Sequence, residues 1–170
     1  MAERVRPHPG AGAVLALDLG THTGFACRHV DGAIRSGAVK FDARGGCGYR
    51  YARLRKWLTD FKNAAGGLDA LWYEDCPFTR PGDSQAPRLY GGFEATVTCW
   101  CEHHGIPYTA INTSTIKKFI TGKGRGHENP KAAVMEAVRA LGYDPATHDE
   151  ADALALLMLA LERMECGRAA

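Results

Sequence analysis

The chain has 170 residues, of which 45% are hydrophobic and 24% are charged, values that are ordinary for one globular domain. No apolar run reaches the roughly 18 residues that span a bilayer, so a membrane protein is not expected. The formal net charge of +2 is too small to identify a partner. Residues 1–12 lack the apolar core of a secretory signal, and we expect a flexible arm before a single domain over residues 13–165.

The cysteine spacing argues against a zinc site and a disulfide framework. The six cysteines include no CxxC pair, and the two that lie nearest in sequence, Cys99 and Cys101, flank Trp100. We therefore expect reduced thiols in a cytoplasmic protein.

The basic residues are concentrated in two segments. Residues 35–62 hold eight Lys or Arg against two Asp, and residues 117–131 hold five against one Glu. Two such blocks on a nearly neutral chain indicate a polyanionic partner. The alternative is that they are solvated helix faces without a partner.

The first strands are predicted to form an antiparallel meander. Apolar residues indicate a strand over 13–19, followed by a tight turn at 20–24. A second strand over 24–30, a hairpin turn at Asp31-Gly32 and a third strand over 34–41 complete the meander.

After residue 46 the apolar residues change to helical spacing. Tyr51, Leu54, Leu58 and Phe61 predict a helix that Gly66-Gly67 ends. The later elements, in chain order, are a strand over 68–74, a Pro-rich loop, a helix over 88–104, a strand over 106–111, a short helix near Ser114, a Gly- and Lys-containing loop over 121–129, a helix from Pro130 to Gly142 and a last helix over 147–164. This order predicts an α/β fold with a mixed five-stranded sheet, three antiparallel strands then parallel additions, and helices on both faces.

Asp18 is a charged residue in an otherwise apolar strand, "VLALD". Burying an ionised carboxylate among apolar neighbours costs on the order of several kcal/mol of folding free energy unless a partner compensates its charge. We therefore expect other parts of the chain to supply a compensating charge.

The last helix, "THDEADALALL", places two acids on its apolar face. Thr147 and Glu150 fit a capping box, and Asp149 is also favoured in a first helical turn. Asp152 has no such explanation, because Asp149 and Asp152 share a face with Leu156 and Leu159. A helix with two carboxylates on its buried side needs a cation there.

Glu74 ends the apolar strand "LDALWYE", at the carboxyl end where α/β folds place their sites. Its neighbour Asp75 competes for this role, and the pattern only mildly favours Glu74. Asp18, Glu74, Asp149 and Asp152 together form the oxygen ligand set that Mg²⁺ or Mn²⁺ prefers. Two such ions can activate a water and stabilise the leaving oxygen of a phosphodiester. The alternative is that each acid is a cap, a salt-bridge partner or an exposed end.

The segments "LALDLGTHTGFA", "LWYEDCP" and "HDEADALALL", in this order and spacing, resemble the RuvC group of Holliday-junction resolvases in the ribonuclease H-like superfamily. The resemblance covers about residues 13–162, and the last motif is its most specific part. It implies that Asp18, Glu74, Asp149 and Asp152 are catalytic acids that bind Mg²⁺ or Mn²⁺, with two ions in the site.

The resemblance also implies residues that contact DNA. Lys117 corresponds to a family lysine after the fifth strand, and Lys131 to one that opens the next helix. Lys118, Lys123 and Arg125 of the same basic block are expected to contact nucleic acid. The family has an aromatic wedge after the metal-binding Glu, for which Phe78 is the candidate. The alternative is that Phe78 packs on its own loop.

The implied activity is a structure-selective endodeoxyribonuclease that nicks a four-way junction symmetrically and leaves 5′-phosphate and 3′-hydroxyl ends. Two symmetric nicks require a homodimer. The stripe of Leu89, Phe93, Val97 and Trp100 is either the dimer surface or core. The chain is similar in character to the compact RuvC-like enzymes of phages and prophages, some of which cut several branched DNAs. The sequence does not indicate a cleavage motif or a branch-migration helicase as a partner.

Three other functions compete. "LDLGTHTG" also resembles the first phosphate loop of actin-like ATPases, which need two such domains. The YqgF group acts on ribosomal RNA precursors and shares the first strand motif, but it usually ends with a different acidic signature. The third alternative is a non-catalytic junction-binding protein, which the presence of all four acids disfavours.

Overall fold

The computed structural model describes residues 12–42, 46–75, 85–123 and 129–167. The elements follow the predicted order βββ-α-β-α-β-α, with two further helices at the end. They are β1 (Val14–Asp18), β2 (His22–Arg28), β3 (Ile34–Lys40), α1 (Cys47–Ala64), β4 (Ala70–Asp75), α2 (Gln85–His104), β5 (Tyr108–Asn112), α3 (Thr113–Thr121), α4 (Pro130–Ala140) and α5 (His148–Cys166).

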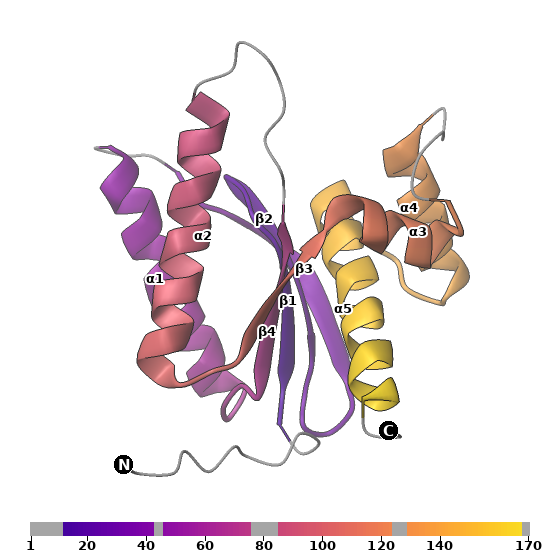
Figure 1. Cartoon of the computed structure of the whole chain (residues 1–170), viewed down its shortest axis with the longest axis horizontal. Coiled ribbons are helices and arrows are strands. Elements are labelled where there is room, and N and C mark those ends of the chain that lie inside the picture. Colours follow the sequence, from indigo (N-terminus) through magenta and orange to yellow (C-terminus); the bar gives the residue numbers. More distant parts are fainter. Residues whose placement is uncertain (1–11, 43–45, 76–84, 124–128, 168–170) are drawn as a thin grey trace.

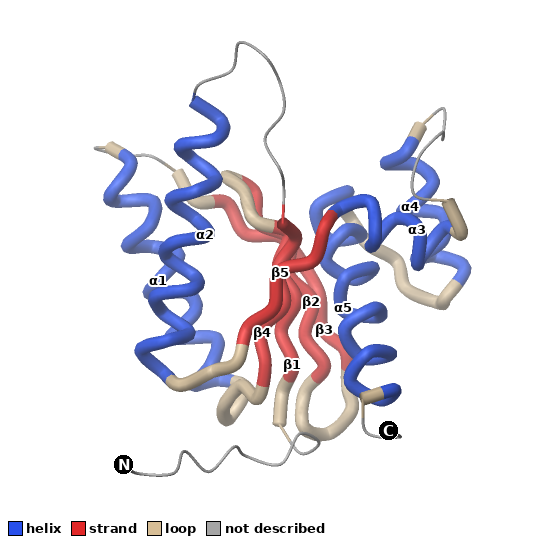
Figure 2. The backbone as a smooth tube through the Cα atoms, viewed as in Figure 1, coloured by secondary structure: helices blue, strands red, loops and turns tan. Residues whose placement is uncertain are grey.

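The strands form one five-stranded sheet in the order β3-β2-β1-β4-β5 (Figure 2). β1, β2 and β3 pair antiparallel, whereas β4 pairs parallel with both β1 and β5. This arrangement confirms the mixed sheet predicted from the sequence. β5 begins two residues later than predicted because Pro107 has no N–H to donate to the ladder, and the N–H of Ile106 bonds back to Cys101 of α2.

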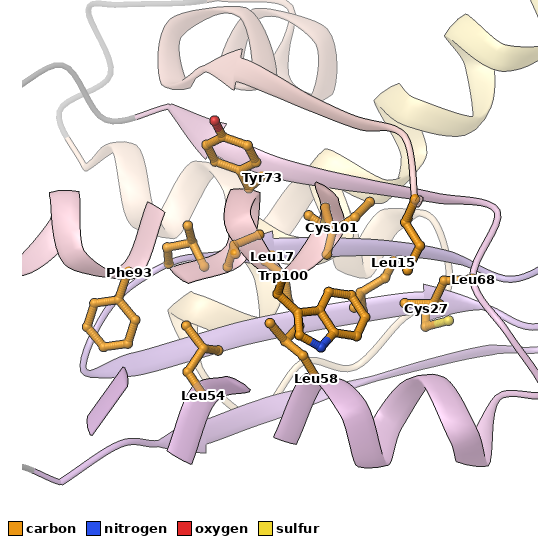
Figure 3. Packing of buried hydrophobic residues seen from close by; sticks show 14 of the residues in the cluster. Leu15, Leu17, Cys27, Leu54, Leu58, Leu68, Tyr73, Phe93, Trp100 and Cys101 are labelled. Carbon is orange, nitrogen blue, oxygen red and sulfur yellow. The ribbon is translucent and has the colours of Figure 1, made fainter. Parts of the chain in front are cut away.

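Helices cover both faces of the sheet, as predicted (Figure 1). One core lies between the sheet and helices α1 and α2, and it contains Leu15, Leu17, Leu54, Leu58 and Phe93 (Figure 3). The second core lies under α5, α3 and α4 on the opposite face. Each apolar strand of the sheet centre is therefore buried on both sides.

The α2 stripe belongs to the first core. Phe93 and Val97 are fully buried, Trp100 is 2% exposed, and Leu89 packs against the same cluster. The Trp100 indole donates a hydrogen bond to the Thr59 hydroxyl of α1. These residues are therefore not available as a dimer surface, and the core alternative is the correct one.

The described residues also bear on membrane insertion, on cysteine pairing and on the predicted hairpin turn. No helix within them is long and apolar enough to cross a membrane. Cys27, Cys99, Cys101 and Cys166, the cysteines whose side chains the structure describes, are unpaired. The hairpin turn at Asp31-Gly32 is present, with the Asp31 carboxylate accepting from the Ala33 N–H and Gly32 at φ 83°.

Candidate active site

Asp18 and Glu74 lie side by side at one edge of the sheet. Asp18 ends β1, and Glu74 is the second-last residue of β4. Because the strands are parallel with Leu17 opposite Tyr73, the acids that follow these two residues are neighbours. Leu17 and Tyr73 point into the α1–α2 core, so strand alternation directs Asp18 and Glu74 toward α5.

The same alternation decides between Glu74 and Asp75. Asp75 shares the sheet face of Tyr73, whose hydroxyl donates to Glu94 of α2 at 3.1 Å, so Asp75 lies on the α2 side. Of the two acids, Glu74 is the one whose charge raises the pKa of Asp18. Glu74 therefore joins Asp18, as the sequence mildly favoured.

The first turn of α5 lies directly against β2 beside Asp18. Gly24 of β2 is the partner of Asp18 in the antiparallel ladder. A Cβ on Gly24 would lie 1.8 Å from the carbonyl oxygen of Asp149, so only glycine leaves room for this approach. Asp149, and Asp152 one turn later, are thereby brought to the edge that holds Asp18.

The electrostatics show that the four acids act on one another. Burial raises the pKa of Asp18 well above its usual value, and the charges of Glu74, Asp152 and Asp149 raise it further. The pKa values of Glu74 and Asp152 are also raised, in both cases mainly by burial. The site therefore concentrates negative charge that the protein alone does not compensate.

Two of the predicted lysines lie within reach of these acids. The charge of Lys117, on α3, lowers the pKa of Glu74 and Asp152, and that of Lys131, at the start of α4, lowers the pKa of Asp18 and Asp152. Lys118 and Lys123, further along the same segment, are exposed. Arg125 and Phe78 lie outside the described residues.

The donor set fits a hard divalent cation, because all four side chains are carboxylates. In their present conformations the carboxylates do not surround a common point. Among the described residues, no three Asp, Glu, His or Cys side chains are arranged to hold a metal ion. One oxygen of Glu74 accepts a hydrogen bond from the Thr113 hydroxyl. Mutual repulsion keeps uncompensated carboxylates apart, so a cation would draw them together.

Several residues that support the site were not found from the sequence. The Thr113 hydroxyl at the start of α3 holds the Glu74 carboxylate, and the Tyr90 hydroxyl donates to the Glu74 carbonyl. Gly24 had a sequence signal, since an isolated glycine in a strand often marks a close backbone approach. Thr113 and Tyr90 follow no pattern that local reasoning detects, because their partner is far away in the chain.

Two surface cavities lie away from the acids. One, of about 570 Å³, lies between α1 and α2 beside Arg55, Cys99 and His103. The other, of about 550 Å³, lies among α3, α4 and α5 beside Phe119 and Leu141. Neither of these two cavities is lined by a predicted site residue.

A mixed sheet of three antiparallel strands and two parallel additions, with acids at adjacent strand ends under a final helix, is a ribonuclease H-like fold. No protein-family model matches the chain. Within the ribonuclease H-like class, its fold is that of RuvC. The structure of Thermus thermophilus RuvC superposes on this chain with a TM-score of 0.65 at 22% sequence identity. The structure of T. thermophilus RuvC in complex with a Holliday junction substrate superposes with a TM-score of 0.70 at 23% identity. Each match covers 85% of this chain and 90% of the RuvC chain.

A similarity to RuvC is also found in the amino-acid sequence. The chain is 26% identical over 110 residues to crossover junction endodeoxyribonuclease RuvC of Thermobifida fusca (strain YX). This match covers 65% of the chain and 57% of that relative. The chain is thus RuvC-like in both fold and sequence.

The raised carboxyl pKa values predict how stability depends on pH without metal. A group whose folded pKa is raised stabilises the protein below its unfolded pKa, near 3.8 for Asp and 4.5 for Glu, and this contribution is lost as the pH rises through the folded value. As the pH rises above these unfolded values, the unfolding temperature of the protein in EDTA should therefore fall more steeply than that of the Asp18→Asn/Asp152→Asn variant. Parallel curves would contradict the charge cluster.

Proposed function

We propose that residues 13–165 form one nuclease domain that cuts four-way junctions or related branched DNA with a divalent metal. The observation that carries the proposal is the convergence of Asp18, Glu74, Asp149 and Asp152 at one edge of a RuvC-like fold. Proteins keep such uncompensated acids where a cation is bound.

The four acids would hold two Mg²⁺ or Mn²⁺ ions. Such ions, when bound, supply a nucleophilic water at neutral pH and stabilise the oxygen that leaves phosphorus. Cleavage on the 3′ oxygen side of the phosphate would leave 5′-phosphate and 3′-hydroxyl ends. Thr113 and Tyr90 would keep Glu74 in place for this task.

Lys117 and Lys131 would act on the scissile phosphate rather than on bases. Both lysines lie close enough to the acids to lower their pKa values, so their charges would stabilise the negative charge that develops in phosphodiester hydrolysis. Paired, symmetric nicks would require two copies of the chain related by a two-fold axis. The surface that joins them would lie outside the α2 stripe, which is buried in the core.

The test is cleavage of a synthetic four-way junction in Mg²⁺ or Mn²⁺, beside a linear duplex and a structured RNA. We expect paired nicks in the junction, no cutting in EDTA and little cutting of the duplex. Preferential cutting of the RNA would favour the YqgF-like alternative. Tight junction binding without cleavage in either metal would favour the non-catalytic one.

The exposed side chains of Lys118 and Lys123 predict that the affinity for junction DNA decreases as the salt concentration rises. Each phosphate contact contributes about 0.9 to the slope of log K against log salt on duplex DNA, so Lys118→Ala/Lys123→Ala should reduce the slope by up to about 2. Fluorescence anisotropy with a labelled junction in EDTA measures it. Arg139→Ala is the matched control, because Arg139 pairs with Asp144 at the far end of α4. An unchanged slope in the double variant would place the phosphates elsewhere.

A further inference from the structure

Glu150 is the acid of the α5 first turn that the proposed metal site does not use. Its side chain is buried, with 9% of the residue exposed. A carboxylate is costly to bury unless it has hydrogen-bond partners. Its surroundings therefore indicate what it does.

Both oxygens of Glu150 have partners from other parts of the chain. The Ser36 hydroxyl of β3 donates to Oε1 at 2.6 Å, and the Ala146 N–H donates to Oε2 at 2.9 Å. The Glu150 N–H in turn donates to the Thr147 hydroxyl. A capping box would place the carboxylate on the N–H of Thr147 itself, whereas here it bonds one residue earlier and also crosses to the sheet.

Ser36 ties the helix to the row of the sheet next to the acids. Ser36 pairs with Ala26 of β2, which pairs with Ala16 of β1. That row is two residues from the one that contains Asp18 and Gly24. The Ser36–Glu150 bond therefore anchors the start of α5 across β2, beside the point where Gly24 lets the helix approach.

We infer that Ser36 and Glu150 are positioning residues for the metal site: they hold the first turn of α5 so that Asp149 and Asp152 face Asp18. The inference rests on the proposed function, and neither residue is required to touch metal or DNA. Asp149 and Asp152 flank Glu150 in the same helix, so a shift or rotation of this turn moves both. Repulsion between the acids favours a shift of this turn away from Asp18. Holding the start of α5 in place therefore keeps Asp149 and Asp152 in the positions that metal binding requires.

The test is Mn²⁺ binding to the protein, measured from the loss of the free Mn²⁺ signal in electron paramagnetic resonance, without DNA. Residues that orient metal ligands typically change metal affinity by about 10- to 100-fold. We expect Ser36→Ala to weaken Mn²⁺ binding by about tenfold, and Glu150→Gln to act in the same direction. Ser36→Thr, which keeps the hydroxyl, should restore binding close to that of the wild type.

Two controls separate positioning from general stability. Thr98→Val removes a hydroxyl that donates to carbonyls of its own helix and should leave Mn²⁺ binding unchanged. Val138→Ala opens a cavity under α4 and should lower the melting temperature without weakening Mn²⁺ binding as Ser36→Ala does. In cleavage, Ser36→Ala should raise the half-saturating metal concentration by a similar factor and keep the rate at saturating metal.

The outcomes distinguish the two proposals. If the wild type binds Mn²⁺ and Ser36→Ala binds it equally well, the positioning role is wrong and the proposed function stands. If Val138→Ala weakens binding as much as Ser36→Ala, the effect is one of stability and the positioning role is again wrong. If the wild type binds no Mn²⁺, the metal-dependent function is wrong, and the positioning role is wrong with it.

Discussion

Asp18→Asn is expected to reduce metal-dependent junction cleavage by at least about a thousandfold, since it removes a ligand rather than a residue that only orients one. The same substitution should raise the melting temperature in EDTA by a few degrees, equivalent to about 1 kcal/mol for a domain of this size. Asparagine has the shape of aspartate without its charge, so it removes the repulsion from Glu74, Asp152 and Asp149. An activity loss combined with a stability gain is the signature of a functional charge.

Asp75→Asn is the matched control for this prediction. Asp75 follows Glu74 in β4 but lies on the α2 side of the sheet, and it is half-buried, as Asp18 is. The control should keep cleavage close to the wild-type rate. Single-turnover cleavage and thermal unfolding of both variants provide the measurements. Wild-type cleavage by Asp18→Asn, or a lower melting temperature in EDTA, would show that Asp18 is not part of a metal site.

Gly24→Ala is expected to be the most disruptive single-methyl change at the site. The new Cβ would lie 1.8 Å from the carbonyl oxygen and 2.3 Å from the carbonyl carbon of Asp149. These are backbone atoms that cannot rotate away, so α5 has to move by more than about 1 Å, and overpacking of this kind typically costs about 1–3 kcal/mol or more. The variant should unfold at a lower temperature and bind Mn²⁺ more weakly than the wild type.

Gly91→Ala is the corresponding control, because a Cβ there meets nothing within 4 Å. Gly91 lies inside α2, where alanine is favoured over glycine by about 0.5–1 kcal/mol, so this variant should be slightly more stable. Thermal unfolding and the Mn²⁺ titration compare the pair. If Gly24→Ala retains wild-type stability and affinity, α5 does not approach β2 as closely as the structure indicates.

The boundaries between elements show where local reasoning succeeded. The hairpin turn at Asp31-Gly32, the start of α4 at Pro130 and the cap of α5 at Thr147 were all predicted, because each depends on residues within a few positions. The Glu150 carboxylate differs from the predicted capping box. Its partner Ser36 lies 114 positions earlier, and no periodicity links residues so far apart.

The sequence by itself determined the element order and the mixed sheet, and it narrowed the candidate acids to a few positions, because strand alternation, helical spacing and caps are local properties of the chain. Only the tertiary structure decided that Glu74 rather than Asp75 faces α5, that the α2 stripe is core, and that Gly24 admits the helix carrying Asp149. Each of these depends on which surfaces pack together. Packing is decided by the shapes and charges of segments far apart in the chain, which local patterns do not contain.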